Sequence, residues 1–258
     1  ILKVYWSLAK LFGRIGKIKT AEKYLDEIIA LEENTLKLLE AYTYKGNLFH
    51  DKDKDYALAI FKEAILRFKD IQETGVIETM LSIYAKLGYE LAVYDVGLFR
   101  ELALKAIYGF DGLKPASRED LYKALKNSAM AMEEQERIED EKWIREQMIQ
   151  VFNGDQGMEY QIELAKNYYR LLMLSIVNGF HYEIEDCYNA LKANTENQKE
   201  EFVIDYYYKG IMAYGIDYFR RQNYGQAKEI LAELLKKKDF TEARYYYARV
   251  LESLGDRK

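Results

Sequence analysis

The near absence of proline is the feature that most constrains how this chain folds. Pro115 is the only proline in 258 residues. Proline breaks helix interiors, so its scarcity permits long helices joined by short turns. Apolar residues recur at spacings of three and four, and strand-like alternation is nowhere sustained. We therefore expect an all-α protein with helices of about 12 to 16 residues, separated by short breaks that carry glycine, asparagine or aspartate.

Internal repetition indicates that these helices form hairpins. Residues 4–33 are predicted to form a helix, a turn marked by glycine and a second helix that carries Ala21. Residues 55–68 repeat the second-helix pattern, with Ala57 at its start and Phe61 four residues later. Ala21 and Ala57 lie 36 residues apart, which is typical of a helical repeat.

The same pattern returns near the C-terminal end of the chain. Gly215 and Tyr218 fall in a predicted first helix, and Ala227 and Leu231 fall in the second. These motifs resemble the tetratricopeptide repeat family, whose period is near 34 residues. The resemblance implies an all-α, right-handed α-α superhelix of about six to seven antiparallel helical hairpins. Small residues such as Gly46 and Gly215 would let paired helices approach closely, and large ones would fill the space between hairpins.

The middle of the chain fits the repeat less well, and we divide the sequence accordingly. We expect repeats in residues 1–110 and 158–258, with an irregular helical hairpin or linker in residues 111–157, all within one continuous solenoid. The proline that often closes tetratricopeptide repeats is missing from every unit, which leaves a HEAT-like array open. Within residues 76–157, where the resemblance is weak, we predict a break at Gly88 and a helix capped by Ser117.

Composition excludes several classes of protein. Hydrophobic residues make up 49% and charged residues 31% of the chain, which is too apolar for disorder and too charged for a membrane protein. The net charge of −5 does not favour nucleic-acid binding through this chain. Cys187 is the only cysteine, so no internal disulfide can form. We expect a cytoplasmic fragment or processed form, or a bacterial envelope protein if a signal or anchor precedes Ile1.

The sequence offers no catalytic, metal-binding or cofactor-binding motif, and we predict none of these sites. His50 and His181 are the only histidines, and neither belongs to a metal motif. Residues 51–55 superficially resemble a calcium loop but lack its glycine and its closing glutamate. Cys187 has acidic neighbours, which do not favour a reactive thiolate. The acidic run at residues 133–141 is predicted to be a charged helix face in water, and the glycines around residues 154–157 are predicted to be a linker.

The resemblance also implies where a partner would bind. In tetratricopeptide arrays the first helix of each hairpin lines the concave surface, where methionine and aromatic side chains suit adaptable peptide recognition. The predicted partner-binding residues are Lys166, Tyr169, Met173, Lys209, Met212, Ile216, Phe219, Arg220, Tyr245 and Arg249. The matching positions near the N-terminal end are Trp6, Lys10, Thr43, Asn47 and His50. A shift of one residue in helical phase would instead place the apolar members in the core.

Three functions are compatible with this sequence. The first is a scaffold or adaptor that holds a protein or peptide partner, acidic or amphipathic, within a larger assembly. The second is a regulatory sensor that binds a signalling peptide and controls an attached effector domain. The third is an enzyme whose catalytic domain lies outside these residues. The first reading agrees best with a repeat array that lacks catalytic motifs.

Overall fold

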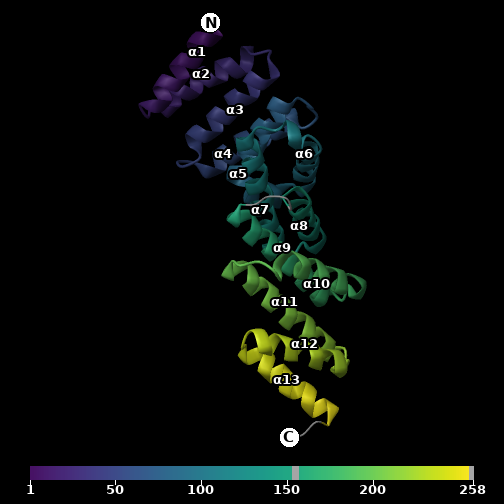
Figure 1. Cartoon of the computed structure of the whole chain (residues 1–258). Coiled ribbons are helices and arrows are strands. Elements are labelled where there is room, and N and C mark those ends of the chain that lie inside the picture. The colour runs from purple at the N-terminus through teal and green to yellow at the C-terminus, as the bar shows by residue number, and fades with distance from the viewer. Residues whose placement is uncertain (153–156, 256–258) are drawn as a thin grey trace. The chain divides into compact units, whose positions relative to one another are not determined.

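The structure is a computed structural model that describes residues 1–152 and 157–255. In this part of the chain there are thirteen α-helices, one short 3-10 helix and no strand (Figure 1). The helices are α1 (Leu2–Arg14), α2 (Ile18–Leu31), α3 (Thr35–Phe49), α4 (Lys54–Phe68), α5 (Thr74–Tyr94), α6 (Val96–Tyr108), η1 (Phe110–Gly112), α7 (Pro115–Glu134), α8 (Ile138–Phe152), α9 (Met158–Asn178), α10 (His181–Thr195), α11 (Glu201–Arg220), α12 (Tyr224–Lys237) and α13 (Thr241–Leu254). The predicted all-α fold is confirmed.

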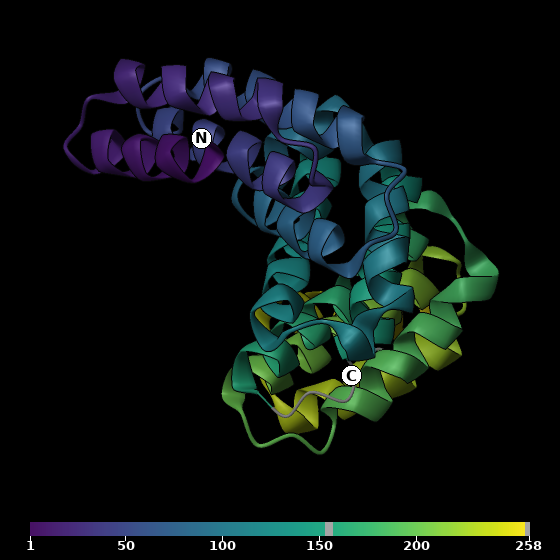
Figure 2. The same ribbon diagram turned by 90° about the horizontal axis from the view of Figure 1, so that it is seen from above.

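Neighbouring helices pack against each other as hairpins, as Figures 1 and 2 show. α1 packs on α2, α3 on α4, α9 on α10 and α11 on α12. First helices also contact the first helix of the next hairpin, as α3 does with α5 and α9 with α11. Helices such as α5 and α11 pack against helices of their own hairpin and of adjacent hairpins, which is how helical repeats build a continuous core. The order gives six successive helix pairs and a final helix, α13, in agreement with the predicted six to seven hairpins.

The chain divides into two compact units, Ile1–Ile144 (unit 1) and Arg145–Lys258 (unit 2). The division falls inside α8, so the first half of that helix belongs to unit 1 and the second half to unit 2. The two units are described separately below. The predicted three-part division at residues 110 and 157 stays a prediction, and the linker predicted around residues 154–157 lies largely outside the described residues.

Small residues allow the close helix approach in unit 1 that the sequence predicts. Ala21 and Ala57 are both fully buried. A Cβ atom added to Gly46 on α3 would lie 2.4 Å from the Phe61 ring of α4. This distance is far below van der Waals contact. Gly46 is therefore the residue that admits the Phe61 ring between α3 and α4.

The predicted break at Gly88 corresponds to a kink within α5, and the turn to the next helix comes later, at Asp95. α5 continues through this residue to Tyr94, with a local kink at Leu87. A Cβ atom on Gly88 would lie 3.2 Å from Asn127 Cβ and 3.4 Å from the Ala124 carbonyl oxygen of α7. The glycine therefore lets α5 and α7 pack closely beside the kink at Leu87, where helical geometry is interrupted but the helix does not end.

The start of α7 corrects a second prediction. The helix begins at Pro115 and its N-cap residue is Lys114, so Ser117 lies within the first turn and is buried. Proline is favoured at the first helical position because its missing N–H has no partner to lose there. Lys114 is held in place by Glu78 of α5, whose carboxylate accepts hydrogen bonds from the Lys114 backbone nitrogen at 2.9 Å and from Nζ at 2.7 Å.

The acidic run at residues 133–141 is not a single solvated helix face. It spans the end of α7, the turn at residues 135–137 and the start of α8. Glu141 is buried, with 1% of its surface exposed. The prediction was wrong for this residue because a charge run gives no information about which neighbouring helix covers it.

Unit 2 repeats the same construction. A Cβ atom on Gly215 of α11 would lie 2.8 Å from Leu231 of α12, and one on Gly210 would lie 2.2 Å from Leu191 of α10. Gly179 ends α9 in the left-handed conformation at φ 70°, which glycine adopts without strain. The predicted turn at Gly179 is confirmed.

A buried polar contact ties α8 to α9 within unit 2. Arg145 and Asn167 are both fully or almost fully buried. Arg145 Nη1 donates a hydrogen bond of 2.8 Å to Asn167 Oδ1. Such a contact specifies one register of packing, because any other register would leave a buried polar group unsatisfied.

None of the helices within the described residues is long and apolar enough to cross a membrane.

Candidate protein-binding face

Three first helices of unit 2 bring side chains together on one surface, which we call the first-helix face. It is formed by residues of α9, α11 and α13. The Tyr169 ring of α9 lies 5.8 Å from the Tyr206 ring of α11. Lys209 Nζ lies 5.3 Å from the centroid of the Tyr206 ring, within the range of a cation–π contact. Burial raises the pKa of Tyr169, and charges on Lys209 and on Glu242 of α13 also act on it. The structure therefore places predicted residues of different hairpins near each other.

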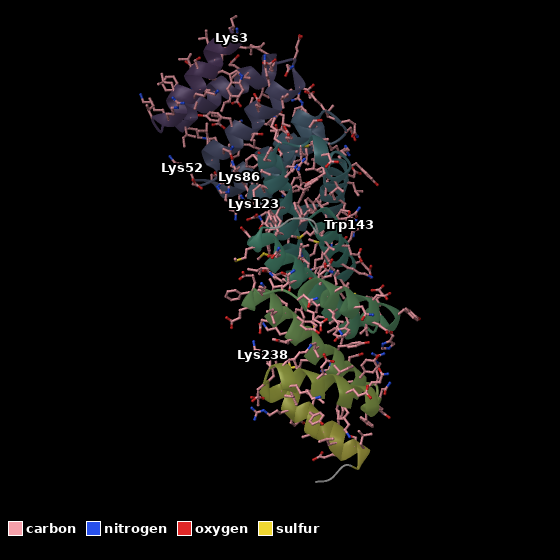
Figure 3. The ribbon with its side chains drawn as sticks, viewed as in Figure 1. Lys3, Lys52, Lys86, Lys123, Trp143 and Lys238 are labelled. Carbon is pink, nitrogen blue, oxygen red and sulfur yellow. The ribbon has the colours of Figure 1, made fainter. Side chains whose placement is uncertain are left out.

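An ion-pair network fixes the cationic part of this face. Asp205 of α11 lies 2.8 Å from Lys209 Nζ and 2.9 Å from Nζ of Lys238, which is labelled in Figure 3. The hydrogen bond from Lys209 lowers the pKa of Asp205; burial opposes the shift, and Lys238 adds to it. The carboxylate is thus neutralised by two lysines, and it orients Lys209 beside Tyr206.

The predicted residues differ in how far they reach solvent. Arg220, Tyr245 and Arg249 are exposed, whereas Ile216 is 7% exposed and therefore belongs to the core of α11. The other predicted residues are half-buried, namely Lys166, Tyr169, Met173, Lys209, Met212 and Phe219.

Met212 and Phe219 are half-buried, so that part of each side chain lies on the face and part packs into the core. Both pack against the buried cluster that contains Ile211 and Leu231. The Phe219 ring also lies 5.6 Å from the Tyr246 ring of α13. These two side chains support the face, and the exposed residues are the ones available to a partner.

Sequence reasoning missed several residues of this face. Asp205 and Tyr206 lie one turn before Lys209 on the same side of α11, and Phe202 lies one turn earlier still, with 70% of its surface exposed. Glu242 lies one turn before Tyr245 on α13. Helical spacing of three or four residues from the predicted positions could have found all of them.

First helices of unit 1 present a comparable set of side chains. Lys10 Nζ lies 5.3 Å from the Trp6 ring centroid, and the Trp6 ring lies 6.3 Å from that of Tyr44. Asn47 of α3 accepts a hydrogen bond of 2.9 Å from Lys86 of α5. Thr43 donates to the Leu39 carbonyl within its own helix.

Unit 1 also carries charged side chains on two further first helices, α5 and α7. Figure 3 shows Lys86 and Lys123 along the same edge of this unit. Burial raises the pKa of Asp120, while the charges of Lys123 and Lys86 act in the opposite direction. Lys86 of α5 and Lys123 of α7 are thus close enough to act on the partly buried carboxylate of Asp120.

The residues considered for metal or nucleophilic chemistry have structural contacts. Asp53 caps α4 by accepting a hydrogen bond from the Tyr56 backbone nitrogen, and His50 Nδ1 lies 2.9 Å from Asp51. Cys187 Sγ lies 3.8 Å from Ser175 Oγ. In residues 1–152 and 157–255 no group of three or more histidine, cysteine, aspartate or glutamate side chains is placed to hold a metal ion.

No model of a known protein family matches the chain, and no curated protein matches it. Among solved structures, the chain is similar to putative kinesin light chain "nearly identical TPR-like repeats" from Podosopora anserina, in two crystal structures. One, of a variant with a single substitution, is 12% identical with a TM-score of 0.36 and covers 90% of this chain and 92% of its own. The other is 12% identical with a TM-score of 0.37 and covers 93% of this chain and 97% of its own.

BtubC (BKLC) from P. vanneervenii is also similar, at 13% identity and a TM-score of 0.39, covering 100% of this chain and 94% of its own. The assignment of this chain rests on its own helix packing. The chain is an all-α helical-repeat protein, built from consecutive hairpins with small residues where the helices approach.

Proposed function

We propose that this chain is a noncatalytic scaffold or adaptor that holds a peptide or helix of a partner protein against the first-helix face of unit 2. The observation that carries the proposal is the convergence of aromatic and cationic side chains from α9, α11 and α13. Tyrosine and arginine are the residues that most often dominate binding energy at protein interfaces. Tyr245, Arg220 and Arg249 supply them on exposed positions of this face.

The charges of the face favour a partner segment with acidic residues. Arg220 and Arg249 are exposed, and Arg249 Nε lies 3.6 Å from Glu252 of its own helix. Asp205, nearer the start of α11, is paired with two lysines. Arginine binds carboxylates through paired hydrogen bonds, which adds geometric specificity. An acidic amphipathic segment would place apolar side chains on the tyrosines and carboxylates on the arginines. We place this interaction in the cytoplasm, where a chain with a single cysteine is kept reduced.

A charge-matched pair of variants tests the proposal. In the first variant, Arg220→Glu is combined with Arg249→Glu on the face. In the control, Lys199→Glu is combined with Lys236→Glu at exposed positions outside it. Both variants change the net charge equally. We expect the first variant to lose proteins that the wild-type chain and the control both retain from a lysate, as measured by quantitative mass spectrometry. Equal retention by the two variants would contradict the proposal.

A further inference from the structure

The first helix of unit 1, α1, carries a row of apolar side chains that reach solvent. The row consists of Val4, Leu8, Leu11 and Ile15, at spacings of four, three and four residues. This spacing keeps the side chains on one side of a helix, as at the a and d positions of a coiled coil. Val4, Leu11 and Ile15 are between 52% and 59% exposed, and Leu8 is half-buried. We call these four residues the aliphatic row.

The side of α1 that packs on α2 is a different one. Ala9 is fully buried, and the rings of Tyr5 and Phe12 each lie 5.8 Å from that of Tyr24 on α2. At 100° per residue, the aliphatic row points roughly 130° away from Ala9. Figure 1 shows α1 at the outer end of unit 1, with α2 and α3 following below it. The aliphatic row is therefore an addition to the core of the hairpin and is not needed to build it.

Positive charge is concentrated beside the aliphatic row. Residues 1–21 hold five lysine or arginine residues and no aspartate or glutamate, in a chain whose net charge is −5. Lys3, Lys10 and Arg14 are exposed and follow one side of α1, roughly 110° from the aliphatic row. Lys10 lies over the Trp6 ring, and no carboxylate in the described part of the chain forms an ion pair with any of the three cations. Lys3 is labelled in Figure 3.

We propose that α1 is a docking site for an acidic amphipathic helix of a partner protein. The partner helix packs leucine or isoleucine side chains between those of the aliphatic row and places glutamate or aspartate beside Lys3, Lys10 and Arg14. Helices pair in this way along apolar side chains at heptad spacing, and the charges beside the seam select the partner. A row of cations without carboxylates is complementary to an acidic helix. This surface belongs to unit 1, so the inference goes beyond the function proposed for unit 2.

Two other occupants agree less well with α1. A second copy of α1 would bring more cations and no carboxylate, because residues 1–21 contain none. A helix that lies on an anionic membrane typically inserts aromatic side chains together with its aliphatic ones. The aromatic residues of α1 instead pack within unit 1, where Tyr5, Trp6 and Phe12 contact Tyr24 or Tyr44.

Selection from a library of helical peptides displayed on phage tests the proposal on the full chain. Each peptide has leucine or isoleucine at its a and d positions, while its e and g positions vary among glutamate, lysine, glutamine and alanine. We expect wild-type protein to enrich glutamate at the varied positions. The variant that combines Val4→Asp with Leu11→Asp should not enrich these peptides. The matched control combines Val93→Asp with Leu66→Asp, at exposed apolar positions of unit 1 outside α1, and should enrich them.

Charge reversal gives a second readout on the enriched peptides, with binding measured by fluorescence anisotropy. Lys3→Glu combined with Arg14→Glu should weaken binding about tenfold, because each substitution replaces an attraction by a repulsion. Lys199→Glu combined with Lys236→Glu changes the net charge equally at exposed positions of unit 2 and should leave binding unchanged.

Enriched acidic peptides that depend on Lys3 and Arg14 support the proposal, even if the variant with Val4→Asp and Leu11→Asp does not fold. Enrichment of lysine, the absence of any enriched sequence, or equal binding by the two charge-reversal variants would overturn it.

Two measurements on wild-type protein and the variant with Val4→Asp and Leu11→Asp cover the other occupants. A dimer in light scattering that this variant loses would assign α1 to a second copy. Sedimentation with phosphatidylserine vesicles that this variant loses would assign α1 to an anionic membrane. Either result would overturn the proposal. Arg220→Glu combined with Arg249→Glu on the first-helix face should leave peptide binding to α1 unchanged, so the two proposals can fail separately.

Discussion

Gly46 is the position in unit 1 where the helices have least room, and Gly46→Ala tests the packing directly. In the interior of a helix, alanine is favoured over glycine by about 1 kcal/mol. Here the added Cβ would lie 2.4, 2.5 and 2.8 Å from three atoms of the Phe61 ring. That ring is 1% exposed and cannot swing out into solvent. Overpacking of this kind costs about 1–3 kcal/mol. Taking the upper part of that range, we expect a net destabilisation on the order of 2 kcal/mol.

Tryptophan fluorescence provides an assay that is specific to unit 1. The sequence has two tryptophans, Trp6 and Trp143, and both lie within Ile1–Ile144. Urea unfolding followed by their emission therefore reports mainly on this unit. Gly97→Ala is a suitable control, because Gly97 is exposed and an added Cβ would meet a single atom, Asp95 Oδ1, at 3.2 Å. We expect the control to change stability by no more than about 0.5 kcal/mol.

A double-mutant cycle identifies the cause. Phe61→Leu alone should destabilise unit 1 by leaving a void, but it should cost less in the Gly46→Ala background, where the smaller side chain relieves the clash. If Gly46→Ala stabilised unit 1, or if the two substitutions were simply additive, the packing argument would be refuted.

Two further predictions concern buried positions. Ala227 is fully buried in the core between α11 and α12. Ala227→Leu should therefore destabilise unit 2 by about 1–3 kcal/mol, as measured by urea unfolding followed by circular dichroism. Ala248→Leu, at an exposed position, is the control and should have little effect. Although burial opposes ionisation, the hydrogen bonds from Lys114 lower the pKa of Glu78 below its ordinary value of 4.5. A lowered carboxyl pKa contributes stability that is fully present above the unfolded pKa and is lost as the pH falls through the folded pKa. The tryptophan-detected unfolding midpoint should therefore fall on acidification below pH 4.5 more steeply in the wild type than in Glu78→Gln; equal slopes would count against this role for Glu78.

The hairpins follow from local sequence, and the sequence was sufficient to predict them. The helical spacing of apolar residues and the small residues Ala21, Gly46 and Ala57 specify which side of each helix packs and how closely. Gly179 marks a turn because its left-handed conformation is costly for other residues. These features depend on residues close together in the chain, so they can be recognised from a single sequence.

The errors occurred where distant helices decide the outcome. The break predicted at Gly88 is a kink at Leu87, after which α5 continues to Tyr94 with α7 packed against Gly88. Ser117 has the chemistry of an N-cap, but Pro115 and the contact of Lys114 with Glu78 start the helix earlier.

The candidate sites divide in the same way. The sequence alone determined that α9, α11 and α13 present aromatic and cationic residues at helical spacing. Only the tertiary structure decided which of them reach solvent, because Ile216 is buried while Arg220, one turn later on the same side of α11, is exposed.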